Sequence, residues 1–246
     1  FFRNFKAKHS SPDIASLHVT PDWNTPDEKT PEPTKSTEET LDELTKYYQH
    51  LFAKEAITDP EPMLRKLRER QIAKSTRDRL EKELDSDEIR LAIRSMARGK
   101  APGPDGLGAE FYIEFEDIIA EDLTRMLNEA HEVGYLPEAV RQGDIIVLYK
   151  KGDTREVRNY RPITLLCVDY KIMSKALVAR LKPVMDEIVS SPQLGFVPGR
   201  VITEATHMVD LALALADEES AEGILVAADW EKAFDRVSWE YLHAAV

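Results

Sequence analysis

Apolar residues recur along this chain with two spacings, one typical of helices and one typical of short strands. The clearest helix is expected after Asp85, which has capping-box spacing with Glu88. The apolar residues that follow have the i, i+3, i+4, i+7 spacing of a buried helix face: Ile89, Ala92, Ile93 and Met96. Gly99 is expected to end this helix, because glycine is common just beyond a helix C-terminus.

Other segments have the same helical spacing. One helix is expected to begin near Ser36, three residues before Glu39, which again is capping-box spacing. Its expected apolar face consists of Leu41, Leu44, Tyr48 and Leu51. The helix expected over residues 203–216 has a predicted inner face of Met208, Leu211, Ala212 and Leu215. Further helices are predicted over residues 61–73, 117–132 and 168–186.

Short apolar runs predict three strands. Residues 145–149 and 161–166 flank a turn rich in lysine and arginine, so an antiparallel hairpin with a basic tip is expected. Residues 224–228 are predicted to be a buried strand that ends at Asp229, followed by a helix through Val237.

The distribution of proline and glycine suggests the domain organisation. Five prolines fall within residues 8–35, which predicts a linker within a first segment, 1–35. Residues 36–75 form a helical segment and residues 76–246 the main domain. The helical segment either docks a partner or packs on the main domain, and both interpretations stay open. The chain starts at Phe1 and stops within an apparent helix, so we expect it to be an excerpt of a longer product.

Composition narrows the class of protein. A hydrophobic fraction of 42% supports a folded core, and a single cysteine, Cys167, fits a reducing compartment. No apolar run approaches the roughly 20 residues of a membrane span. The net charge is −12, yet residues 141–200 contain 11 Lys and Arg side chains against 6 Asp and Glu. A basic segment within an acidic chain remains compatible with nucleic acid binding.

The strongest candidate for chemistry is the segment Asp-Trp-Glu-Lys-Ala-Phe-Asp at residues 229–235. A rigid strand can aim a terminal carboxylate such as that of Asp229 at a divalent cation. The alternative is that Asp229 caps the following helix.

Four segments, taken in order, resemble the reverse transcriptases of LINE-like non-LTR retrotransposons and group II introns. Residues 99–107 read Gly-Lys-Ala-Pro-Gly-Pro-Asp-Gly-Leu, as in the family. The two predicted hairpin strands, with Asn-Tyr-Arg-Pro-Ile-Thr-Leu-Leu at 159–166, resemble its fingers motifs. Residues 193–200 are similar to Gln-x-Gly-Phe-x-Pro-Gly-Arg, and residues 229–237 to palm motif A. The resemblance extends over residues 76–246.

The resemblance implies an α+β fold with right-hand polymerase fingers and a partial palm, truncated after motif A and preceded by helices and the proline-rich linker. It implies an RNA-directed DNA polymerase that uses two Mg²⁺ ions, an RNA template, a DNA primer and deoxynucleoside triphosphates. Metal contacts would come from Asp229, the catalytic carboxylate, and from the backbone carbonyl of Trp230. The implied nucleotide contacts are Lys150, Arg161, the backbone N–H of Ala233 and the steric gate Phe234, and Arg200 would touch the template. The location of this chain is left unknown, and the resemblance implies an intracellular one, in the nucleus or the cytoplasm.

The second palm motif of the family, with two further aspartates, does not occur in this sequence. Two divalent ions about 4 Å apart repel by roughly 16 kcal/mol at an effective dielectric near 20, which one carboxylate does not offset. We therefore expect this chain to be inactive as a polymerase on its own. The alternatives are a non-catalytic RNA-binding remnant, a helical interaction module over residues 36–130, and an unrelated Mg²⁺-dependent phosphotransferase using Asp229 and Asp235.

Overall fold

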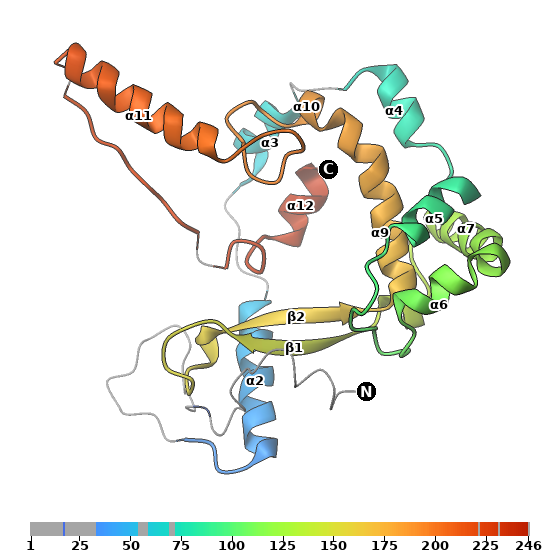
Figure 1. The fold of residues 1–246 in the computed structure, drawn as a ribbon. Helices are drawn as coiled ribbons and strands as arrows, with labels where there is room; N and C mark the ends of the chain where they lie inside the picture. Colours follow the sequence, from blue (N-terminus) through green and yellow to red (C-terminus); the bar gives the residue numbers. More distant parts are fainter. Residues whose placement is uncertain are drawn as a thin grey trace. The chain divides into compact units, whose positions relative to one another are not determined.

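A computed structural model describes residues 17, 33–53, 59–68, 72–220, 222–230 and 232–245 (Figure 1). These residues form two compact units. The hairpin unit contains the described residues of 1–60, 143–165 and 231–246, and the helical unit contains those of 61–142 and 166–230. Most of the predicted proline-rich linker lies outside the described residues.

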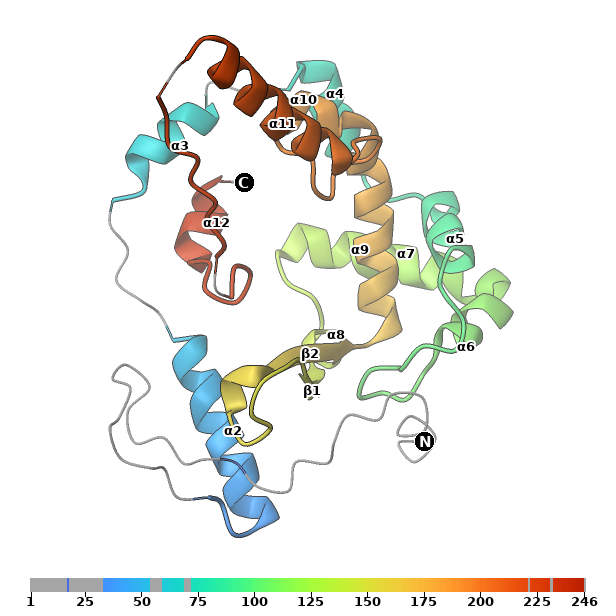
Figure 2. The same cartoon turned by 60° about the vertical axis from the view of Figure 1, so that its left-hand side comes forward.

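The helical unit is built around three helices, α5 (Ser86–Arg94), α7 (Glu116–Val133) and α9 (Val168–Leu181), which lie together in both views (Figure 2). Their contact faces form one apolar core, whose most deeply buried members include Ile89, Ile93, Leu127 and Ile172. The remaining helices of this unit are α3 (Glu61–Arg68), α4 (Lys74–Leu80), α6 (Ala109–Glu114), α8 (Glu138–Arg141), α10 (Met185–Ile188) and α11 (Thr203–Glu218). A 3-10 turn, Lys182–Val184, joins α9 to α10.

The start of α5 confirms the predicted capping box. Asp85 accepts a hydrogen bond from the backbone N–H of Glu88 at 2.8 Å, and Glu88 accepts one from the N–H of Asp85 at 3.0 Å. The predicted end was wrong, because α5 stops at Arg94 and Gly99 lies in the loop beyond it. The proline- and glycine-rich sequence of residues 99–106 keeps this loop irregular.

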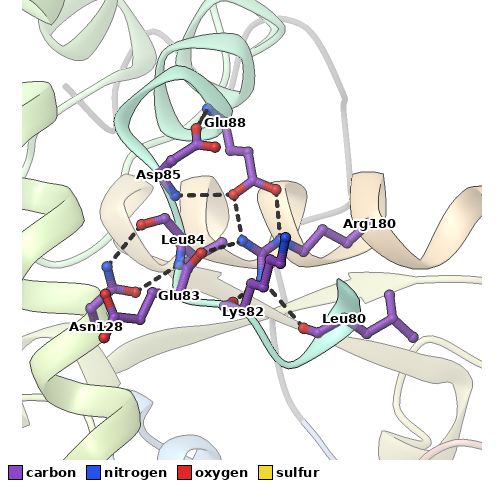
Figure 3. Close-up of polar contacts among 8 residues, drawn as sticks. All are labelled: Leu80, Lys82, Glu83, Leu84, Asp85, Glu88, Asn128 and Arg180. Carbon is purple, nitrogen blue, oxygen red and sulfur yellow. Dashed lines mark hydrogen bonds and ion pairs between the residues drawn. The ribbon is translucent and has the colours of Figure 1, made fainter. Parts of the chain in front are cut away.

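Arg180 of α9 joins the α4–α5 connection to the helical core (Figure 3). Its guanidinium forms a two-pronged ion pair with Glu88, with bonds of 2.6 and 2.5 Å. The same group donates to three backbone carbonyls, those of Leu80, Lys82 and Glu83. The Arg180 side chain is only 13% exposed. The pKa of Glu88 is held below its usual value, chiefly by the hydrogen bonds from Arg180.

Asn128 of α7 also binds the α4–α5 connection, through hydrogen bonds to Leu84 (Figure 3). Its side-chain oxygen accepts from the N–H of Leu84 at 2.9 Å, and its nitrogen donates to the Leu84 carbonyl at 2.8 Å. Backbone groups that no helix or strand would satisfy are therefore paired by side chains.

The hairpin unit contains helix α2 (Thr37–Leu51), strands β1 (Gly143–Tyr149) and β2 (Tyr160–Leu166), and helix α12 (Trp239–Ala245). Leu166, the last residue of β2, belongs to the helical unit. The two strands form a two-stranded sheet, and the N–H of Lys150 donates to the carbonyl of Asn159 at 2.9 Å. Because this bond joins the end of β1 to the start of β2, the strands run antiparallel, which confirms the predicted hairpin.

Helix α2 packs on the hairpin through aromatic side chains. Tyr47 and Tyr48 are buried in a cluster with Val157 and Tyr160. Ser36 caps the helix, as predicted, by accepting from the N–H of Glu39 at 3.1 Å. The predicted apolar face was partly wrong: Leu41 is 59% exposed, whereas Leu44 and Leu51 do contact the cluster. Tyr47 lies closer to the centre of that face, because helical geometry places positions 44, 47, 48 and 51 together.

The region after residue 200 departs most from the predictions. Residues 222–230 form no strand, and Ile224, Leu225 and Val226 are exposed rather than buried. A strand needs a neighbour for its backbone hydrogen bonds, and the described residues contain no third strand to supply one. The predicted helix after Asp229 is also wrong, because residues 232–236 form turns and α12 begins only at Trp239.

Helix α11 confirms the predicted element but not its predicted inner face. None of its residues is buried, and Met208, Leu211 and Leu215 are all exposed. The described residues therefore combine helices with one small sheet, which confirms a mixed α and β structure. No helix among them has the length and apolarity needed to cross a membrane.

Candidate functional site

The hairpin carries two of the predicted nucleotide contacts, one near each end of the connection between its strands. Lys150 directly follows β1, and Arg161 is the second residue of β2. Both side chains are exposed, and neither forms an ion pair within the described part of the chain. Both cations are therefore accessible to an anionic ligand.

The rest of the predicted basic tip is partly neutralised by its own carboxylates. Arg155 binds Asp153 at 2.8 Å, and Arg158 lies 3.4 Å from a carboxylate oxygen of Glu156. The free positive charge of the tip is therefore concentrated on fewer groups than the sequence suggested.

The turn over residues 232–236 carries the other two predicted nucleotide contacts, Ala233 and Phe234. Both are exposed, and the Phe234 side chain is 87% exposed. The preceding Lys232 donates to the carbonyl of Tyr160 at 3.4 Å. Since Tyr160 directly precedes Arg161, this contact links the turn to the start of β2. Lys150, Arg161, Ala233 and Phe234 all belong to the hairpin unit.

Asp229 and Trp230 lie at the end of the exposed segment 222–230, which belongs to the helical unit. The alternative that Asp229 caps a helix is wrong, since residues 232–238 are turns and irregular chain. Among the described residues, no three histidine, cysteine, aspartate or glutamate side chains come together as a possible metal site. These residues therefore do not by themselves fit a two-metal centre.

Arg200 has a role that its motif did not reveal. Its guanidinium donates to the carbonyls of Ser190, Gln193 and Val189 at 2.5, 2.7 and 3.1 Å, and to Asp186 at 2.9 Å. The side chain is only 15% exposed. Arg200 therefore holds the glycine- and proline-rich loop together, and the predicted template contact stays a prediction.

A pocket of about 610 Å³ in the helical unit was not predicted. It lies between the loop after α5 and helix α9, and three lysines line it, Lys100, Lys171 and Lys175. Lys171 donates to the carbonyl of Ala101 at 3.3 Å, and Lys175 donates to the carbonyl of Ser95. A carbonyl fixes an ammonium group without cancelling its charge, so Lys171 and Lys175 keep their positive charge in defined positions.

Sequence reasoning also missed Lys232 and Tyr47, whereas Tyr48 was predicted to lie on the apolar face of α2 and is buried there. The signal for Tyr47 was present, since it adjoins Tyr48 and lies three residues after Leu44, both on the predicted apolar face of that helix. Burial raises the pKa of the Tyr48 hydroxyl, with a smaller contribution from the charge of Asp235. The contacts of Lys232 could not be recognised from the sequence, because its partners lie far away along the chain.

Comparison with known proteins assigns the chain to a family. Residues 149–245 match the family model described as "Reverse transcriptase (RNA-dependent DNA polymerase)". Over 85% of its length the chain is 36% identical to "Transposon TX1 uncharacterized 149 kDa protein" of Xenopus laevis. Over 61% of its length it is 33% identical to "RNA-directed DNA polymerase from mobile element jockey" of Drosophila melanogaster.

These relatives are much longer proteins. The chain spans 16% of the length of the first and 17% of the second. A third relative, "Retrovirus-related Pol polyprotein from type-1 retrotransposable element R1" of Bradysia coprophila, is 27% identical over 64% of this chain and 16% of its own length. Enzymes of this family generally use divalent metal ions. This chain therefore carries reverse transcriptase domain sequence of the kind encoded by LINE-like, non-LTR retrotransposons.

Proposed function

We propose that this chain supplies the face of an RNA-directed DNA polymerase that binds the incoming deoxynucleoside triphosphate. The observation that carries the proposal is the contact between Lys232 and the Tyr160 carbonyl. It links the turn of Ala233 and Phe234 to the strand of Arg161. The reverse transcriptase match over residues 149–245 includes all of these residues.

The proposed roles follow from the chemistry of each group. Lys150 and Arg161 bind triphosphate oxygens, for which the planar fork of arginine is well suited. The backbone N–H of Ala233 donates to the same group, and the exposed ring of Phe234 occupies the place of a ribose 2′-hydroxyl. The reaction would join a primer 3′-hydroxyl to the α-phosphate and release pyrophosphate, with an RNA template selecting the base. Divalent metal, proposed to be Mg²⁺, would stabilise the charges on the attacking and leaving oxygens.

We further propose that the chain alone does not extend a primer. Asp229 and the Trp230 carbonyl would be its contribution to the metal centre, and the described residues bring no further carboxylates to them. The proposed division of the chain is residues 1–35, 36–75 and a partial polymerase domain over 76–246.

Removing the charge of Lys150 or Arg161 is expected to weaken nucleotide binding. A hydrogen bond to a charged group contributes about 1.5–3 kcal/mol, so Lys150→Met and Arg161→Met should each raise the Kd at least about tenfold. The measurement is a fluorescence titration with a labelled deoxynucleotide, mant-dATP, in the presence of Mg²⁺. Lys151→Met is the matched control, because it removes the same charge from the neighbouring exposed position. An equal loss of nucleotide affinity in all three variants would show that only the overall charge of the hairpin matters.

A non-catalytic RNA-binding role is the second candidate, and the lysine-lined pocket favours it. Binding through phosphate contacts weakens steeply with salt. If this role is the correct one, RNA affinity should depend on Lys171 and Lys175 and show no discrimination between nucleotide sugars. The nucleotide-binding role instead requires that Phe234 discriminates deoxyribose from ribose in the bound nucleotide.

A further inference from the structure

Three segments of the hairpin unit meet at one backbone carbonyl, that of Tyr160. Lys232 donates to it at 3.4 Å from the turn of residues 232–236, and the hydroxyl of Tyr48 donates to it at 3.5 Å from α2. Tyr160 is itself almost completely buried. The carbonyl thus joins β2, the turn and a helix that lies about a hundred residues earlier in the sequence.

Tyr47 makes the second contact between α2 and the turn. The ammonium group of Lys232 lies 5.9 Å from the centroid of the Tyr47 ring, which is within cation–π range. Tyr47 and Tyr48 pack edge to face, with centroids 5.1 Å apart and an interplanar angle of 76°. The two rings therefore support each other as well as Lys232.

The backbone of Lys232 suggests why the turn needs such support. Its φ is +53°, in the left-handed region that residues with a side chain rarely adopt. A strained residue of this kind persists only where its surroundings hold it, and such residues cluster at functional sites. The contacts that Lys232 makes with Tyr160 and Tyr47 are suited to hold it.

We propose that Tyr47 of α2, supported by the ring of Tyr48, is a positioning residue for the nucleotide-binding turn, acting through Lys232. This inference rests on the proposed function of Ala233 and Phe234. Helix α2 lies outside the matched reverse transcriptase region of residues 149–245, so it would be an added part of the nucleotide site. Of the two interpretations of residues 36–75, packing on the polymerase-like part is the one that this proposal requires.

The test is a double-mutant cycle read by limited trypsin digestion of the whole chain. Cleavage after Arg236, at the end of the turn, reports how firmly the turn is held. Tyr47→Leu and Lys232→Met should each speed this cleavage about two- to fivefold, the range expected for losing an exposed to partly buried cation–π contact. The double variant should be no faster than the faster single variant, because both changes remove one interaction.

Controls separate positioning from general loss of structure. Tyr47→Phe keeps an aromatic face for the cation, so its cleavage rate should stay closer to that of the wild type than the rate of Tyr47→Leu does. Leu41→Ala removes an exposed apolar side chain of α2 and should also leave the rate unchanged. Cleavage after Arg125, in the helical unit, should not change in any variant.

Two results would contradict the positioning role of Tyr47. The first is a double variant in which the two increases in cleavage rate multiply. The second is a Lys232→Met variant whose cleavage rate after Arg236 is unchanged. Lys232→Met decides even if Tyr47→Leu unfolds the hairpin unit, since Lys232 is a half-buried turn residue outside the buried apolar cluster. The Kd for mant-dATP should rise together with the cleavage rate. If mant-dATP binds no variant, including the wild type, the proposed function fails while the digestion still decides whether α2 holds the turn.

Discussion

Gly103→Ala is expected to destabilise the helical unit by about 3 kcal/mol or more, the upper end of the cost of overpacking a core. A methyl group at residue 103 would stand 2.5 Å from the carbonyl carbon of Leu166 and 2.6 Å from the Cα of Cys167, and closer still to the Cys167 nitrogen. These are backbone atoms at the junction of β2 and α9, so no side chain can rotate away to make room. The measurement is urea denaturation followed by far-UV circular dichroism.

Gly195→Ala is the matched control for this substitution. A Cβ there would meet only the end of the Gln193 side chain, at 3.9 Å. Its stability should match that of the wild type or rise slightly, because alanine restricts the unfolded chain. If Gly103→Ala and Gly195→Ala behaved alike, the close approach of the 99–106 loop to Leu166 and Cys167 would be wrong.

Arg180→Met is expected to cost about 3 kcal/mol, the lower end of the range for breaking a buried ion pair by removing one partner. The lower end applies because the Glu88 side chain remains 27% exposed. The variant would leave Glu88 unpaired and would remove the donors to the carbonyls of Leu80, Lys82 and Glu83. Arg125→Met is the matched control, since Arg125 pairs with Asp122 at 2.7 Å while both side chains are exposed. Exposed pairs contribute little, so this control should change stability far less.

The Arg180 contact also has a pH signature. The pKa of Glu88 is lower in the folded protein, mainly because Arg180 donates to its carboxylate. Its stabilising contribution is therefore complete above the unfolded-state pKa, about 4.3, and is lost as the pH falls through the lower folded pKa. Denaturation at a series of pH values from 7 downward should show this loss in the wild type and a smaller loss in Arg180→Met. If the stability of the wild type and of Arg180→Met fell equally with pH, Arg180 would not be the cause of the lowered Glu88 pKa.

Local sequence signals predicted the parts of the fold that depend on neighbouring residues. The Asp85–Glu88 capping box and the apolar spacing from Ile89 to Ile93 need only one helix, and both were confirmed. The hairpin was predictable because its strands are separated by a short polar connection. Such features are encoded within a few residues, so pattern and propensity suffice.

The predictions failed where the outcome depends on distant partners. Residues 224–228 have strand composition, but a strand forms only beside another strand, and the described residues offer none. The apolar side of α11 was predicted to face a core, and no described segment covers it. Whether a residue is buried depends on which other elements pack against it. The sequence of its own helix or strand does not contain that information.

The candidate site was predictable by resemblance more than by pattern. Nothing local distinguishes Lys150 or Arg161 from ordinary surface charge, and only the family motifs single them out. The links that join these segments, Lys232 to Tyr160 and Tyr48 to Tyr160, span 72 and 112 residues. Such contacts became visible only in the folded chain.

We propose that this chain binds a deoxynucleotide but does not polymerise DNA on its own. It is tested most directly by primer extension with the purified chain, an RNA template, an annealed DNA primer, Mg²⁺ and all four deoxynucleotides. We expect mant-dATP binding under the same conditions and no template-dependent extension. Extension that is lost in Asp229→Asn would contradict it, because the chain would then hold a complete catalytic centre.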